Sequence, residues 1–213
     1  MKQEILALDR DYQPHQWLTR EDAIVHEATN EVIDHLGEAI FLFRGGHNRD
    51  GVQSTIATSS IIVLSGAPRS RVHRHPALTN SALFKRDRHL CAYCGKVFPH
   101  SQLTRDHVMP TSLGGPDVWM NVVTACRGCN STKSNLRPGE RLSHRRPGPQ
   151  GNGQFHPLYV PYVPCKAEAM IMRNRDIKAD QMEFLLARVK NKQSRVVEYA
   201  RDLFGRDAFQ AYT

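Results

Sequence analysis

Short apolar runs and polar stretches alternate along this chain, and the pattern predicts both strands and helices. Three apolar runs in the first third have the length of strands: Ile5–Leu8, Ala39–Phe43 and Ser60–Leu64. Between the first two runs, Thr19 and Asp22 have the spacing of a helix capping box. Residues 44–51 have the composition of a turn. The pattern therefore predicts a small α/β unit over residues 1–66.

A second group of elements is predicted after this unit. We expect a short helix over residues 81–88 and a strand over Leu103–Val108. Further on, apolar residues recur at the spacings of amphipathic helices, namely at Phe184, Leu185, Ala187, Val189, Val196, Val197, Ala200, Leu203 and Phe204. Stripes of this kind usually serve core packing. We therefore expect residues 165–213 to form a helical hairpin packed on the rest of the protein.

Two segments connect these parts. Residues 67–90 hold six Lys or Arg residues and three His against one acid, Asp87. This basic connector is either a solvated charged surface or a strap that contacts phosphates, and we favour the strap because it leads into the cysteine-rich module at residues 91–138. Glycine and proline recur after that module, which predicts a linker over residues 139–164.

Composition and charge narrow the classes of partner. The chain has 213 residues, a net charge of +8 and a pI near 9.5. Such a basic surplus favours a polyanionic partner, although charge alone does not separate nucleic acid from membrane headgroups. Apolar runs are too short for a membrane span, and the N-terminus lacks the pattern of a secretory signal. We expect a cytoplasmic protein with no membrane partner.

Four of the five cysteines form two CxxC pairs, Cys91/Cys94 and Cys126/Cys129. Four thiolates suit a closed, tetrahedral zinc site, and a two-residue gap lets each pair bind from one tight turn. The pairs are further apart than in an ordinary zinc ribbon, so something is inserted between them. A redox pair is the alternative, but it would leave one CxxC unexplained. We therefore expect a structural zinc ion.

The insert and the residue after the second pair carry a different set of groups. Asp106 and Asn130 offer oxygen ligands for a divalent cation, and His107 offers an imidazole that can act as a base. Neighbouring side chains on a strand point to opposite faces. Asp106 and His107 can therefore serve one site only if the strand ends or bends there, which Pro110 and the turn residues 114–116 favour.

The sequence Asp106-His107, followed by Asn121 and Asn130 and bracketed by the CxxC pairs, resembles HNH endonucleases with a ββα-metal core. It is similar in particular to the McrA-like branch, which carries a zinc-binding cysteine quartet. The motif-bearing match runs from Phe84 to about Pro138. Together with the apolar pattern, the resemblance implies an α+β fold: a ββα-metal core with a four-cysteine zinc site, a preceding small α/β unit and C-terminal helices.

The resemblance implies a role for each motif residue. His107 would be the general base that activates water. Asp106 and Asn130 would hold the catalytic cation, and Asn121 would orient the loop or the base. The third signature position is Asn130 rather than histidine, which favours Mg²⁺ or Mn²⁺ over a catalytic zinc ion.

The resemblance also implies DNA, double-stranded in the first instance, as the partner. Arg105, Arg127 and Lys133 are either phosphate contacts or solvated charges. A single HNH core acts on one strand, so a double-strand break would require a homodimer or two successive nicks. Two other functions stay open: a catalytically inactive, zinc-stabilised module that binds nucleic acid, and a redox or zinc-sensing regulator.

Overall fold

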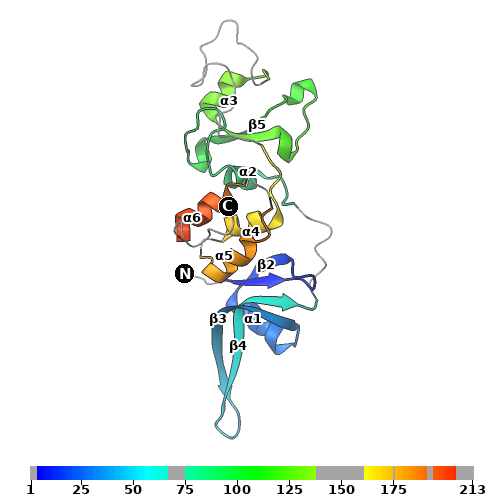
Figure 1. Ribbon diagram of the computed structural model, residues 1–213, viewed down its shortest axis with the longest axis vertical. Helices are drawn as coiled ribbons and strands as arrows, with labels where there is room; N and C mark the ends of the chain where they lie inside the picture. Colours follow the sequence, from blue (N-terminus) through cyan, green and yellow to red (C-terminus); the bar gives the residue numbers. More distant parts are fainter. Residues whose placement is uncertain (1–3, 67–74, 138–160, 175, 191–193, 205–213) are drawn as a thin grey trace. The chain divides into compact units, whose positions relative to one another are not determined.

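The computed structural model describes residues 4–66, 75–137, 161–174, 176–190 and 194–204 (Figure 1). The chain divides into two compact units. The first contains Met1–Arg74, Lys166–Lys190 and Val196–Thr213, and the second contains His75–Cys165 and Asn191–Arg195. Helices and strands occur in both, and the predicted α+β class is confirmed. Residues 67–74 of the predicted connector and most of the predicted linker lie outside the described residues.

A four-stranded sheet in the order β2-β1-β4-β3 forms the first unit. Its strands are β1 (Ile5–Leu8), β2 (Pro14–Leu18), β3 (Val32–His47) and β4 (Gln53–Leu64). Strand β1 pairs antiparallel with β2 and parallel with β4, while β3 and β4 form an antiparallel hairpin. All four residues of β1 are buried, as expected for a short, continuous apolar run in the middle of a sheet.

In the described part of the first unit, four helices accompany this sheet: α1 (Arg20–Ala28), α4 (Lys166–Arg173), α5 (Ala179–Leu186) and α6 (Val196–Phe204). The capping box of α1 is present, with Thr19 Oγ1 accepting from the Asp22 amide at 3.1 Å. Gln181 on α5 donates to the carbonyls of Glu4 and Ser60 at 3.0 and 2.8 Å, which ties this helix to the sheet. The described part of residues 165–213 therefore contains three helices, where a helical hairpin was predicted.

The β3–β4 hairpin is longer than the apolar runs predict, and it extends beyond the other two strands (Figure 1). The prediction of a turn over residues 44–51 is wrong in its first half, because β3 continues to His47. A register shift between Arg44 and His47 accommodates the two glycines there. The turn itself is closed by the side chain of Asn48, whose oxygen accepts from the amides of Asp50 and Val52.

The second unit contains α2 (Asn80–Arg86), β5 (Leu103–His107), β6 (Val122–Cys126) and α3 (Arg127–Lys133), with short 3₁₀ turns at His100–Gln102, Thr111–Leu113 and Trp119–Asn121. The predicted helix over residues 81–88 corresponds to α2, and the predicted strand over residues 103–108 corresponds to β5. Strands β5 and β6 pair antiparallel, with Leu103 opposite Cys126 and His107 opposite Val122. Because α3 follows β6 directly, these elements form a ββα unit.

Strand β6 is buried on both faces. Val123 and Ala125 pack in a cluster with the cysteines, and Val122 packs in a second cluster with Leu83 and Trp119. Alternation along the strand places these neighbours on opposite sides. The ββα unit is therefore held between two small cores. No helix in the described part of the chain is long and apolar enough to cross a membrane.

Candidate functional site

The four CxxC sulfur atoms converge at one point. Cys91, Cys94, Cys126 and Cys129 place their sulfurs within 4.8 Å of one another, and three of the four residues are buried. Four sulfurs bound to one zinc ion lie about 3.8 Å apart, given a Zn–S bond near 2.3 Å. The arrangement therefore fits a metal ion such as zinc.

Local backbone geometry builds each half of this quartet. In the first pair, the Gly95 amide donates to the Cys91 carbonyl at 2.9 Å, and Gly95 adopts a left-handed conformation with φ of 66°. In the second pair, Cys126 precedes α3, and its sulfur accepts from the Cys129 amide at 3.4 Å. A hydrogen bond from the Cys129 thiol is the main reason why the pKa of Cys91 falls to about 4. Cys91 thus favours thiolate, the form that binds metal. Burial raises the pKa of Cys94, and the hydrogen bond to Cys91 raises the pKa of Cys129, so these two groups favour the thiol until a metal ion binds.

Strand β5 ends at Asp106 and His107, whose side chains have different surroundings. Asp106 is only 5% exposed. Its Oδ1 accepts from Lys133 Nζ at 3.0 Å, and its Oδ2 accepts from the Tyr93 hydroxyl. Burial raises the pKa of Asp106 above its ordinary value, and it outweighs the opposing effects of Tyr93 and Lys133. Asp106 therefore lies inside the ββα unit.

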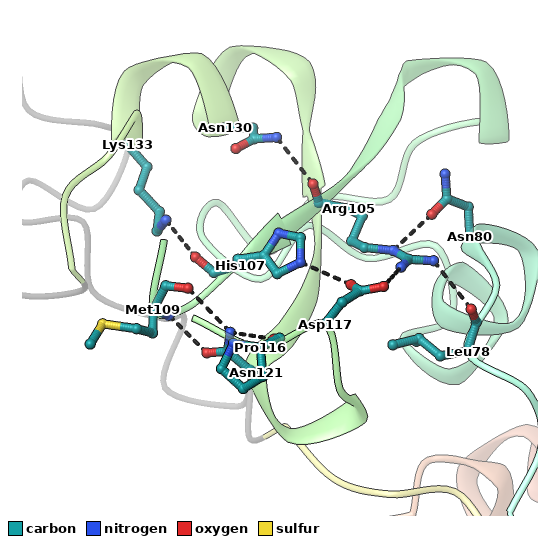
Figure 2. A network of polar contacts seen from close by, with 10 residues as sticks. All are labelled: Leu78, Asn80, Arg105, His107, Met109, Pro116, Asp117, Asn121, Asn130 and Lys133. Carbon is teal, nitrogen blue, oxygen red and sulfur yellow. Dashed lines mark hydrogen bonds and ion pairs between the residues drawn. The ribbon is translucent and has the colours of Figure 1, made fainter. Parts of the chain in front are cut away.

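His107 faces the loop between β5 and β6 (Figure 2). Its Nε2 is 2.9 Å from Asp117 Oδ1, and Arg105 Nη1 donates to the other oxygen of that carboxylate at 2.6 Å. The hydrogen bond from Arg105 is the main reason why the pKa of Asp117 lies below its ordinary value. One ionised carboxylate thus connects His107 with an arginine.

Asn121 closes the loop that carries Asp117. Its Nδ2 donates to the carbonyls of Met109 at 3.1 Å and Pro116 at 2.8 Å, and its Oδ1 accepts from the Met109 amide at 2.9 Å (Figure 2). The backbone of Gly115 passes so close that a Cβ there would lie 1.9 Å from the Met109 carbonyl oxygen. The loop therefore needs both the amide at position 121 and a glycine at position 115.

Asn130 lies on α3 and reaches back to β5. Its Nδ2 donates to Thr104 Oγ1 at 2.9 Å and toward the Arg105 carbonyl at 3.5 Å. These donations fix the orientation of the amide, and no hydrogen bond to Asn130 Oδ1 occurs among the residues that the structure describes. On the same helix, Lys133 donates to Asp106 and to the His107 carbonyl at 2.8 Å. Helix α3 thus contacts the end of β5 through two side chains.

The three basic residues named from the sequence have different environments. Arg127 is exposed on α3. Arg105 donates to three groups within the unit, namely Asp117, Asn80 and Leu78. Lys133 is buried and holds Asp106. Of the three, only Arg127 is both exposed and without a side-chain hydrogen bond in the described chain.

Sequence reasoning missed two residues of this site, Tyr93 and Asp117. Tyr93 lies inside the first CxxC pair, where it reads as a spacer between ligands. Asp117 follows a Gly-Gly-Pro turn, where an acid is common on solvent-exposed chain. The spacing of Arg105 and His107 offered one signal, because two basic groups on the same face of a strand favour a shared acidic partner.

The comparisons with known proteins bear on this same segment. Residues 91–141, about a quarter of the chain, match the family model described as HNH endonuclease. The match includes all four cysteines, the end of β5 and helix α3. A comparison with curated proteins finds no match. The match of residues 91–141 to the HNH endonuclease family indicates a nuclease-type function and a nucleic-acid substrate.

Proposed function

We propose that this chain is a metal-dependent DNA endonuclease in which His107 takes the proton of the attacking water. The proposal rests on the hydrogen bonding of the two ring nitrogens of His107. Its Nε2 is held by Asp117, and no hydrogen bond to Nδ1 occurs among the described residues. A general base needs a fixed ring with one nitrogen available to accept a proton. His107 meets both conditions within the segment that matches the nuclease family.

Asp106 and Asn130 would hold the divalent cation. Each oxygen of the Asp106 carboxylate accepts one hydrogen bond, which leaves it further acceptor capacity. The fixed Asn130 amide adds a second oxygen. These oxygen ligands fit Mg²⁺ or Mn²⁺. The Asp106 carboxylate would then bind both the cation and the Lys133 ammonium. When bound, the cation would neutralise charge that develops on the phosphate and the leaving oxygen.

The remaining groups orient and attract the substrate. As the water oxygen bonds to phosphorus, its proton passes to His107 Nδ1, and the P–O bond to the leaving strand breaks. Asn121 keeps the loop beside His107 closed. Arg127 would contact a phosphate from the exposed face of α3, and the net charge of +8 favours approach of a polyanion.

The cysteine quartet would hold a structural zinc ion. All four positions are thiols, so the protein supplies a closed set of ligands and leaves no site for substrate. Zinc would then stabilise the folded module and position β6 and α3. With double-stranded DNA, one core would cut one strand at a time, so linear product would require a homodimer or a second nick.

One observation favours the alternative of an inactive, zinc-stabilised module that binds nucleic acid. Asp106, the proposed cation ligand, already pairs with Lys133. A cleavage assay distinguishes the two functions. Supercoiled plasmid is incubated with the full chain in EDTA, Mg²⁺ or Mn²⁺. An endonuclease gives nicked and then linear product with Mg²⁺ or Mn²⁺ but none in EDTA, and Asp106→Asn should weaken that response. Plasmid binding without cleavage in any of the three would support the inactive module.

A further inference from the structure

Arg105 and His107 lie two residues apart on β5, and their side chains both reach one carboxylate. A strand places such residues on the same face. His107 Nε2 approaches Asp117 Oδ1 at 2.9 Å, and Arg105 Nη1 donates to Asp117 Oδ2 at 2.6 Å (Figure 2). The two oxygens of Asp117 are therefore divided between the proposed base and a permanently charged guanidinium.

Arg105 is itself held in place. Its Nε donates to Asn80 Oδ1 at 2.9 Å, and its Nη2 lies 3.4 Å from the Leu78 carbonyl. The guanidinium plane is thus fixed by groups near the start of α2 as well as by Asp117. A fixed planar donor orients the carboxylate that it binds. Arg105 therefore sets which way Asp117 faces.

The loop backbone restrains Asp117 from its other side. Asn121 Nδ2 donates to the carbonyl of Pro116, the residue directly before Asp117, at 2.8 Å. The same nitrogen donates to the Met109 carbonyl at 3.1 Å. Position 117 is thus tied to the end of β5 by the Asn121 amide through the backbone and by Arg105 through the side chain.

We propose that Asp117 is a positioning residue for His107. Its carboxylate accepts a hydrogen bond from Nε2–H and thereby fixes the plane of the imidazole. Nδ1 then carries no proton and is the nitrogen that receives the proton from water. The physical reason is that neutral imidazole carries one N–H, and an acceptor at Nε2 keeps the proton there. The inference rests on the proposed function of His107 as the base.

Asn at position 117 provides a sharp test because Arg105 constrains how it binds. Arg105 can only donate, so it would select the amide oxygen of the new side chain. The amide NH₂ would then face His107 Nε2 and donate to it, which moves the ring proton to Nδ1. Asp117→Asn should therefore block the proton-accepting nitrogen, whereas Asp117→Ala should only release the ring. Although asparagine has nearly the shape of aspartate, Asp117→Asn is therefore expected to lower kcat at least as much as Asp117→Ala does.

The experiment compares Asp117→Asn, Asp117→Ala and the matched control Val118→Ala in the full chain. Val118 is the exposed neighbour on the same loop. We expect kcat for plasmid nicking to fall about 10- to 100-fold in Asp117→Ala and at least as far in Asp117→Asn, by analogy with partners that orient a histidine ligand. KM should not rise, because removal of a negative charge cannot weaken phosphate binding electrostatically. Val118→Ala should retain the parent kcat.

Nitrogen-15 NMR of the His107 ring gives a readout independent of cleavage. The parent should show the Nε2–H tautomer, and Asp117→Asn should show the Nδ1–H tautomer, at unchanged zinc content and Tm. A parent that does not cleave but shows this tautomer switch would refute the nuclease and support the role of Asp117. An unchanged tautomer in Asp117→Asn, or an Asp117→Ala variant with the parent kcat, would overturn the inference.

Discussion

The ammonium of Lys133 lies 3.0 Å from the Asp106 carboxylate, and both residues are only 5% exposed. Lys133 also donates to the His107 carbonyl, so one side chain of α3 holds both of the residues that end β5. Burial without a partner is costly for either charge. The pair therefore keeps the end of β5 in place and puts a positive charge next to the proposed cation site.

Lys133→Met should destabilise the folded chain by about 3 kcal/mol, because among the residues that the structure describes it leaves the buried Asp106 with Tyr93 as its hydrogen-bond donor. Mn²⁺ should recover part of this loss, since the cation would take the place of the missing charge. Denaturant unfolding with and without Mn²⁺ measures both effects. Arg127→Met, an exposed cation on the same helix, is the control and should be nearly neutral. Equal stability of the two variants would contradict the account.

Gly115→Ala should open the loop that carries Asp117. The added Cβ would lie 1.9 Å from the Met109 carbonyl oxygen, so the backbone must shift, and we expect a loss of roughly 1–3 kcal/mol together with a lower kcat. Gly128→Ala is the matched control, because a Cβ there meets nothing within 4 Å. Alanine is also the better helix former at that position on α3. Thermal unfolding and plasmid nicking should separate the two variants, and similar behaviour would argue against a tight loop.

Cys129→Ser should remove the bound metal and unfold the second unit. A structural zinc ion contributes its binding free energy to folding, so chelation should have the same effect as the substitution. Metal analysis of the purified chain should find one zinc ion in the parent and in Cys165→Ser, because Cys165 is outside the quartet. A folded Cys129→Ser variant without zinc would contradict a structural role and favour the redox or sensing alternative.

Arg86→Met should be among the most destabilising changes in the chain, at about 3–5 kcal/mol. The Arg86 side chain is fully buried, pairs with Asp87, and donates to the carbonyls of Trp119, Tyr162 and Val122. Arg86→Lys should rescue little, because one ammonium cannot replace a planar fork of donors. Chemical denaturation of both variants gives the comparison, and a well-folded Arg86→Lys variant would show that charge alone suffices.

The cysteine quartet could be predicted from sequence because CxxC spacing restricts both the turn and its ligands. The opposite surroundings of Asp106 and His107 also follow from strand alternation. The partners of these residues could not be predicted. Asp117 reaches His107 across a loop whose path depends on one amide, at Asn121, and on the absence of a Cβ at Gly115. Contacts that depend on a loop path leave no periodic pattern in the sequence.

The length of the β3–β4 hairpin could not be predicted for a different reason. Its outer part, residues 44–55, is exposed on both faces, so no alternation of apolar and polar residues marks it as a strand. The two glycines before His47 favour a turn, yet the register shift there lets the strand continue. Hydrogen bonds between the strands, rather than burial, define this part of the fold.

The most direct test of the central claim is single-turnover nicking of supercoiled plasmid by the parent, His107→Ala and His100→Ala, at saturating Mg²⁺ or Mn²⁺. His100 is an exposed histidine of the same unit and controls for loss of an imidazole. We expect His107→Ala to lose at least roughly 100-fold in rate, at unchanged zinc content and DNA affinity, and His100→Ala to match the parent. Cleavage by His107→Ala at the rate of the parent would contradict the assignment of His107 as the base.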